Sequence, residues 1–177
     1  MNKYFKNWVI LILFPCSVFA QENKIQLTEK VSIEFPDKPN KRDVQGMATV
    51  YTIKLADSTA NFNVVVTNLE KSNGLSADVL STAQAEPGFW EQTESSFISS
   101  LGTDVNPNIL SKEIIEINNQ KILKLLIGTN RNGKYAELTA YIFVNNTFSI
   151  KILYTKRSEN ASIESKNKFL NSLKINE

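Results

Sequence analysis

Apolar and polar residues alternate along several segments of the chain, which is typical of β-strands that bury one face. The alternation is clearest over residues 147–156, where one face holds Phe148, Ile150, Ile152 and Tyr154. Turn residues such as Asn-Gly at 132–133 separate these segments and favour hairpins. The pattern predicts strands over residues 30–35, 47–56, 61–69, 109–117, 120–128, 134–144 and 147–156.

Three other segments have apolar residues at helical spacing. Ser76 is a suitable N-cap for a helix over residues 76–84. Pro87 cannot lie inside a helix but suits its first position, so we expect an interruption at residues 85–86 and a second helix over residues 87–101. We expect Asn160 to cap a third helix, whose apolar stripe consists of Ile163, Phe169, Leu170 and Leu173. Since the connections after residue 102 are short, the last four strands should form an antiparallel meander. The sequence therefore predicts one α+β domain, an antiparallel sheet packed against helices.

The first twenty residues differ in character from the rest of the chain. Lys3 and Lys6 precede an apolar run over residues 8–14, and Pro15 ends it. This order is typical of a secretory signal peptide over residues 1–20, with cleavage between Ala20 and Gln21. The run is far shorter than the ~20 apolar residues of a membrane-spanning helix. We therefore expect an exported domain over residues 21–177, periplasmic or secreted, without a transmembrane span.

Cys16 raises the alternative of a lipid anchor, because Leu13 stands three positions before it, as in bacterial lipoprotein signals. Pro15, however, occupies the position where such signals have a small residue. The sequence favours soluble export over lipidation at Cys16.

Composition narrows the possible chemistry. The 177 residues include 20 Lys+Arg, 18 Asp+Glu, one Cys and no His. Cleavage after Ala20 removes Lys3 and Lys6, which leaves 18 basic and 18 acidic residues. A chain without net charge has no bulk electrostatic attraction for nucleic acid. Without His, and without Cys in the expected mature chain, Ser-His-Asp, Cys-His and His-metal chemistry is excluded.

Two segments resemble a known group of proteins. Residues 31–39, VSIEFPDKP, are similar to the strand, Phe-Pro, short turn and Pro that open bacterial exported proteins of the PsbP-like fold. Residues 169–175 resemble the terminal helix of the same group, and the order of elements between them fits. The resemblance implies an αβα sandwich around an antiparallel sheet. The group includes an extrinsic photosystem subunit and a Ran-binding protein, so the resemblance implies partner binding and supplies no catalytic motif.

No pattern indicates a catalytic, cofactor or metal site. The string at residues 165–168 matches S-x-x-K, but it falls on the polar side of a helix and lacks the accompanying motifs. Glu91 and Glu94 share a helix face, which is most simply solvated. Glu113 and Glu116 lie three apart on a strand and so point to opposite faces.

Two places could contact a partner. Phe89 and Trp90 lie at the beginning of the second helix, near the edge of the core, although the register of Trp90 with Phe97 favours burial. Arg131 and Asn132 lie at a hairpin tip, where loops often carry function. We expect an exported non-enzymatic protein, a binding or accessory module for a protein or cell-envelope component.

The alternative is a hydrolase or lyase that uses Asp, Glu, Tyr and Lys side chains. It requires carboxylates from separate elements, such as Glu91 and Glu137, to meet in a cleft.

Overall fold

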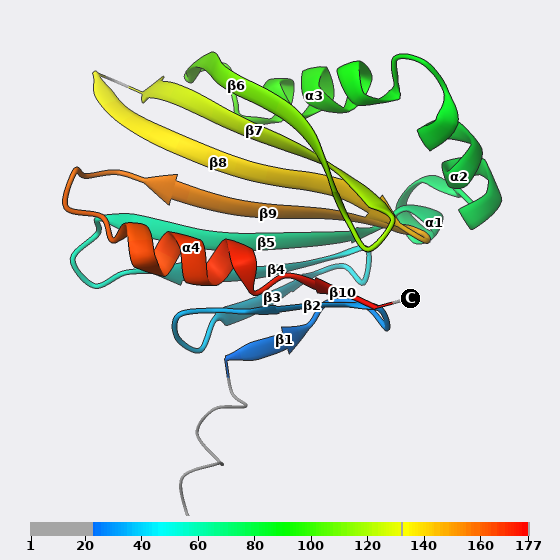
Figure 1. Cartoon of the computed structure of the whole chain (residues 1–177), viewed down its shortest axis with the longest axis horizontal. Helices are drawn as coiled ribbons and strands as arrows, with labels where there is room; N and C mark the ends of the chain where they lie inside the picture. The colour runs from blue at the N-terminus through cyan, green and yellow to red at the C-terminus, as the bar shows by residue number, and fades with distance from the viewer. Residues whose placement is uncertain (1–22, 132, 177) are drawn as a thin grey trace, which may run out of the picture.

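The central feature of the fold is a seven-stranded antiparallel sheet with the strand order β3-β4-β5-β9-β8-β7-β6 (Figure 1). The computed structural model describes residues 23–131 and 133–176, so the expected signal peptide, its cleavage site, Cys16 and Asn132 lie outside the described residues. The strands are β3 (Asn40–Val44), β4 (Ala48–Lys54), β5 (Ala60–Asn68), β6 (Asn106–Ile117), β7 (Gln120–Arg131), β8 (Lys134–Asn145) and β9 (Phe148–Lys156).

A second, three-stranded sheet joins the two ends of the described part of the chain, in the order β1-β2-β10. Its strands are β1 (Lys24–Gln26), β2 (Val31–Glu34) and β10 (Lys174–Ile175). The helices are α1 (Leu69–Asn73), α2 (Ala77–Ala85), α3 (Phe89–Ser100) and α4 (Ile163–Asn171). Among the residues 23–131 and 133–176, no helix has the length and apolar character that a membrane crossing requires.

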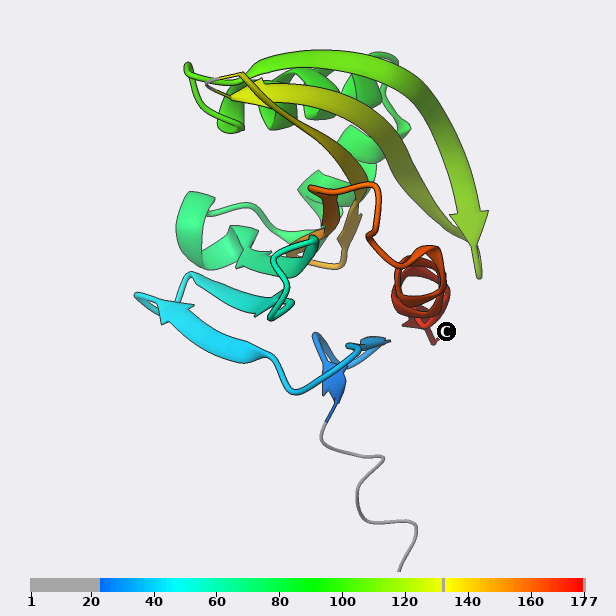
Figure 2. The same ribbon diagram turned by 90° about the vertical axis from the view of Figure 1, so that its left-hand side faces the viewer.

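Different layers cover the two faces of the large sheet (Figure 2). On one face, α4 and β2 pack against β5 and β9, and the ring of Phe169 lies 5.1 Å from the rings of both Phe35 and Phe62, centroid to centroid. On the other face, α3 packs through Phe97 against β7 and β8. Successive side chains of β7 point to opposite faces of the sheet, so this strand contributes to both cores. Ile122 packs in the core on the α4 side and Leu123 in the core on the α3 side. This arrangement is the α+β sandwich that the sequence predicts.

The turns explain why the strands pair as they do. Asn118 and Asn119 have φ values of 48° and 62°, the left-handed conformation that a two-residue hairpin turn requires and that Asn tolerates. Gly133 has φ 75° in the next hairpin. The meander β6-β7-β8-β9 is confirmed by its continuous antiparallel register.

The helix termini differ in part from the expectation. Ser76 does cap α2, because its side chain accepts a hydrogen bond from the Val79 N–H. Pro87 precedes α3 instead of lying within it, and Gly88, with φ 88°, is the N-cap. The assignment of Asn160 as a cap is wrong. Ser162 caps α4, and Ile163, expected in the apolar stripe, is 73% exposed.

Candidate functional site at the Trp90 recess

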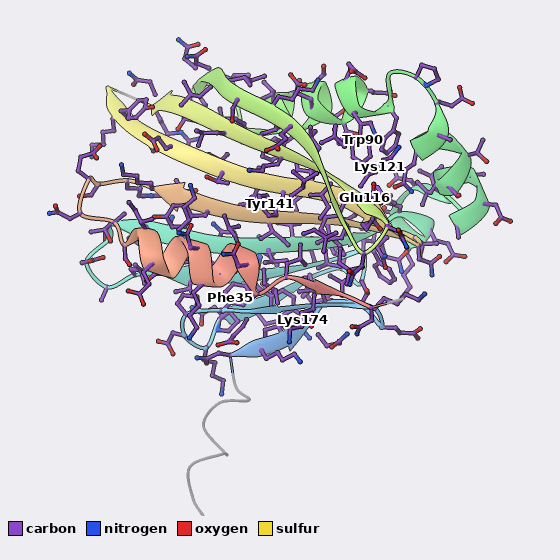
Figure 3. All side chains as sticks on the ribbon, in the orientation of Figure 1. Phe35, Trp90, Glu116, Lys121, Tyr141 and Lys174 are labelled. Carbon is purple, nitrogen blue, oxygen red and sulfur yellow. The ribbon has the colours of Figure 1, made fainter. Side chains whose placement is uncertain are left out.

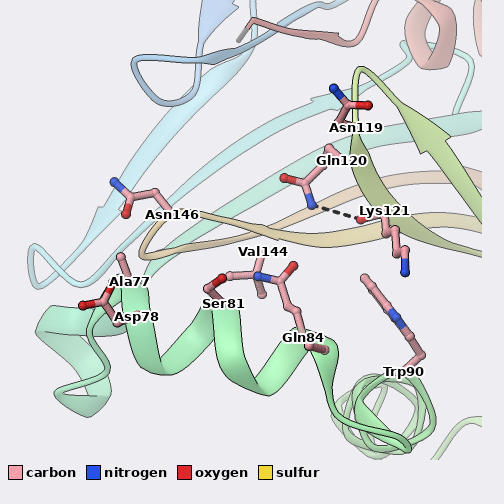
Figure 4. A pocket seen from close by; sticks show the side chains of 11 residues that line it. Ala77, Asp78, Ser81, Gln84, Trp90, Asn119, Gln120, Lys121, Val144 and Asn146 are labelled. Carbon is pink, nitrogen blue, oxygen red and sulfur yellow. Dashed lines mark hydrogen bonds between the residues drawn. The ribbon is translucent and has the colours of Figure 1, made fainter.

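A recess of about 550 Å³ opens at one end of the large sheet (Figure 4). Its walls come from α2, the first turn of α3, the β6–β7 turn and the β8–β9 turn. Asn119 and Asn146, both with positive φ, allow the two turns to be tight, and both residues line the recess. Four segments that are far apart in the sequence therefore form one concave surface.

Trp90 reaches this recess because the helical conformation is interrupted between α2 and α3. Pro87 disfavours helix at Glu86, and Gly88 adopts φ 88°, which is costly for residues with a Cβ. The new helix therefore begins with Phe89 and Trp90 beside the sheet edge. Trp90 is half-buried: it packs against the core around Phe97 and also lines the recess. Phe89 supports it, with its ring at 87° to the Trp90 ring and 5.0 Å between centroids.

The rest of the lining is polar. Ser81 and Gln84 come from α2, Gln120 and Lys121 from the start of β7 (Figure 4). The side chain of Lys121 extends toward the Trp90 indole, and Glu116 lies at the same end of the sheet (Figures 3 and 4). Asp78, in the first turn of α2, also lines the recess.

The two charged side chains that line the recess, those of Asp78 and Lys121, have no ionic partner among the described residues. A concave surface that combines an aromatic ring with a few polar groups is the usual composition of a binding site. A ligand can stack on the indole, accept hydrogen bonds from the amide and ammonium groups, and donate hydrogen bonds to the amide and carboxylate oxygens.

The structure separates the two places that the sequence proposed for partner contact. Phe89 and Trp90 lie at the first turn of α3, whereas Arg131 lies at the hairpin beyond the other end of that helix (Figure 1). Arg131 pairs there with Asp104, with 2.8 Å between Nε and Oδ2. The guanidinium thus links the β7–β8 hairpin to the segment after α3. Of the two places, only the pair of Phe89 and Trp90 is at the recess, where Trp90 lines the surface and Phe89 packs against it.

The acidic residues on α3 are engaged in ion pairs. Lys112 of β6 contacts both Glu94 and Glu91, with 3.8 Å between its Nζ and Oε1 of Glu91. The hydrogen bond that Lys112 donates to Glu94 raises the pKa of Lys112. On the opposite face, Glu113 accepts a 3.0 Å hydrogen bond from Lys124, which raises the pKa of that lysine. These contacts join neighbouring elements, and the two α3 carboxylates meet at the Lys112 ammonium instead of facing an open cleft.

Glu91 and Glu137 do not meet in a cleft. Glu91 contacts Lys112, whose register partner Leu125 belongs to the core under α3. Glu137 precedes Leu138 of that same core, so it points to the other face of the sheet. There it interacts electrostatically with Lys166 of α4.

Lys166 and Tyr154 form a partly buried polar contact on the α4 side. The Nζ of Lys166 lies 5.5 Å from the centre of the Tyr154 ring. Burial lowers the pKa of Lys166 and raises the pKa of Tyr154. The S-x-x-K string is not assembled as a catalytic pair, because Lys168 pairs with Glu34 of β2 at 3.4 Å.

Sequence reasoning identified the aromatic corner but missed the opposite wall. Ser81 and Gln84 look like ordinary exposed helix positions, and Lys121 like an ordinary strand terminus. The available signal was the pair of Asn-rich turns at residues 118–119 and 145–146, whose shared location depends on the sheet order. A one-dimensional pattern does not contain that order.

No family model and no curated protein matches this chain. Among solved structures it is similar to the solution structure of cyanobacterial PsbP (CyanoP) from Synechocystis, with 12% sequence identity and a TM-score of 0.58. The match covers 92% of this chain and 98% of CyanoP. The fold is PsbP-like. This likeness shows the fold alone, since identity is low and one fold hosts many functions.

Two further matches are weaker. A crystal structure from Bacteroides thetaiotaomicron has 12% identity and a TM-score of 0.48 over 88% of this chain, which spans about half (49%) of that protein. A protein of unknown function from Pseudomonas aeruginosa has 12% identity and a TM-score of 0.43, covering 75% of this chain and 81% of that one.

Proposed function

We propose that this chain is an exported, non-enzymatic module that binds a protein or another component of the cell envelope through the Trp90 recess. The observation that carries the proposal is the half-buried indole of Trp90 at a concave surface, with Lys121 beside it and Asp78 at the other end of the recess (Figure 4). Neither charged residue has an ionic partner among the described residues. Aromatic anchors of this kind supply much of the free energy in protein interfaces.

Export is supported by the order of charged, apolar and small residues over positions 1–20. The PsbP-like fold adds no argument about the ligand, because a fold shared at 12% identity does not transfer a binding partner.

A binding role is also favoured over the hydrolase or lyase alternative. General acid–base catalysis by two carboxylates needs both groups at one substrate. Glu91 and Glu137 lie on opposite faces of the sheet, and Glu94 and Glu113 are engaged with lysines. These positions support a module that recognises a partner without transforming it.

Site-specific photo-crosslinking in cells that produce the full chain tests the proposal. A photo-crosslinking amino acid placed at Gln84 or Lys121, on the recess, should capture a discrete envelope species. The same amino acid at exposed Glu164 of α4 should not capture it. Capture should fall at least tenfold in Trp90→Ala, the loss of about 1.4 kcal/mol or more that an aromatic anchor implies.

Tyr135→Ala is the matched control, because Tyr135 is an exposed aromatic residue at the opposite end of β8. The melting temperature of Trp90→Ala has to be measured in parallel, since Trp90 also packs against the core. Undiminished capture by a folded Trp90→Ala chain, or capture at Glu164 alone, would exclude the recess as the contact surface.

A further inference from the structure

Strand β6 forms a free edge of the large sheet. It is twelve residues long, and within the part of the chain that the structure describes no strand pairs with its outer side (Figure 2). Three of its apolar side chains are exposed: Ile109 by 40%, Leu110 by 46% and Ile114 by 42%. An edge strand presents unpaired N–H and C=O groups, and a long apolar one is a template for pairing with another strand.

The other edge of the same sheet is built differently. Strand β3 has only five residues, with the sequence Asn-Lys-Arg-Asp-Val, and all five are exposed. Short length and charge are the usual protection of an edge against pairing. In the first half of β6, Pro107 and a bulge between Ile109 and Ser111 interrupt the ladder. The second half carries charges of both signs, Lys112, Glu113 and Glu116, among apolar residues. Residues 111–117 then pair with β7 without interruption.

The regular half of β6 is complementary to itself. Lys112, Ile114 and Glu116 share the α3 face, because their register partners on β7 include the core residues Leu125 and Leu123. In an antiparallel pair of two β6 strands with Ile114 opposite Ile114, Lys112 of each copy lies opposite Glu116 of the other. Opposite charges at directly facing positions stabilise antiparallel pairs, and like charges destabilise them.

Neighbouring registers lack this complementarity. Centring the pair on Lys112 or on Glu113 places like charges opposite each other, and centring it on Ile115 places Ile114 opposite Glu116. Glu116 has no ionic partner among the described residues, so it is available for Lys112 of a second copy. Lys112 already contacts Glu94, but its side chain remains 34% exposed and can extend this network.

We propose that β6 pairs antiparallel with β6 of a second copy of this chain, with a two-fold axis at Ile114, so that the two large sheets join into one. Such a contact is isologous and closed, because each copy contributes the same strand once. It is independent of the Trp90 recess as a ligand site.

The single cysteine of the chain allows a sharp test. In the full chain carrying Cys16→Ser, the substitution Ile114→Cys places two thiols directly opposite each other in the proposed dimer. Facing Cα atoms in an antiparallel pair are ~4.5–5.5 Å apart, which is within the range that a disulfide spans. We expect most of the oxidised protein to run as a covalent dimer on a non-reducing gel.

Two matched controls separate this contact from random collision. Ile109→Cys lies on the same strand with similar exposure, but its symmetry mate would be about ten residues away, ~33 Å along the pair. Arg42→Cys lies on the exposed edge strand β3. Both should remain monomeric under the same oxidation.

Sedimentation analysis of the Cys16→Ser chain supplies the second measurement. Glu116→Lys places lysines opposite each other twice, so it should weaken the dimer about tenfold or more. Its melting temperature should equal that of the unsubstituted Cys16→Ser chain at concentrations where both are monomeric. A monomer at all concentrations, equal cross-linking of Ile109→Cys and Ile114→Cys, or a disulfide from Ile114→Cys only to a different protein would overturn the proposal.

Discussion

At the scale of single residues, the alternation along β9 determines which side chains hold the layers together. Ile150 and Ile152 are fully buried on the α4 side, as the sequence pattern predicts. Phe148 shares their face but is only half-buried, since it lies at the strand end. On the other face Leu153 packs against the core under α3, so β9 is partly covered on both sides.

Ile150→Ala should lower the free energy of unfolding by ~2–5 kcal/mol, because it removes buried methyl groups and leaves a cavity. Ser149→Ala, on the other face, should change it by less than ~0.5 kcal/mol. Urea unfolding of both variants measures the difference. Similar losses for the two would mean that the burial of β9 is not one-sided at this position.

Lys151 predicts a specific pH dependence. It is half-buried beside the ring of Phe97, 5.8 Å from Nζ to the centroid, and burial lowers its pKa below the ordinary 10.5. The folded chain therefore releases this proton at lower pH than the unfolded chain does. The unfolded state binds more protons in the window below 10.5, so the contribution of Lys151 to stability rises with pH through that window.

Lys151→Met should remove this rise. The measurement is the difference in unfolding free energy between wild type and variant from pH 7 to pH 10, which should shift in favour of wild type as pH increases. Lys54→Met, at an exposed position of β4, controls for the loss of a positive charge. A constant difference over the whole range would contradict a destabilised Lys151 ammonium.

At the scale of elements, long periodic segments were predictable, and of the short ones only β2 was, because Pro36 ends its alternation over residues 30–35. The strands that became β4 to β9 have enough residues to show alternation, and the helices α2 and α3 follow from Ser76 and Pro87. The short elements β1, β3, β10 and α1 have three, five, two and five residues, too few for a period. Their pairing partners lie elsewhere in the chain, so tertiary contacts decide whether they form.

The beginning of α4 shows the same limit. Both Asn160 and Ser162 are good capping residues by type. The structure selects Ser162 because Ala161 is buried just before it, and the Ser162 backbone is extended while its side chain accepts from the Ser165 N–H at 3.1 Å.

Capping mutants test this assignment. Ser162→Ala should cost about 1 kcal/mol of stability, since one N–H of the first turn loses its acceptor. Asn160→Ala should be close to neutral. Thermal unfolding of the two variants distinguishes them, and a larger loss for Asn160→Ala would place the helix start two residues earlier.

At the scale of the whole molecule, the two ends of the described chain close the fold. β2 pairs with both β1 and β10, so residues separated by more than a hundred positions become neighbours. Ser172 reinforces the closure: its Oγ accepts from the Glu34 N–H at 2.8 Å and donates to the Glu34 carbonyl at 3.1 Å. The recess has a similar origin, because its walls meet only once the sheet is assembled. Sequence reasoning could therefore find Trp90 but not Lys121 opposite it.

Because β10 pairs with β2, we expect the stability of β2 to depend on β10. Ile175 is buried in the same core as Val31 and Phe35, while its neighbour Lys174 is exposed. Ile175→Ala should lower the unfolding free energy by ~2–5 kcal/mol, and Lys174→Ala should have little effect. Amide hydrogen exchange should also speed up in β2, because β10 supplies one of its two neighbours. Unchanged exchange in β2 of a destabilised Ile175→Ala chain would mean that β2 does not depend on β10. The pairing of the two ends of the described chain would then not be what stabilises the small sheet.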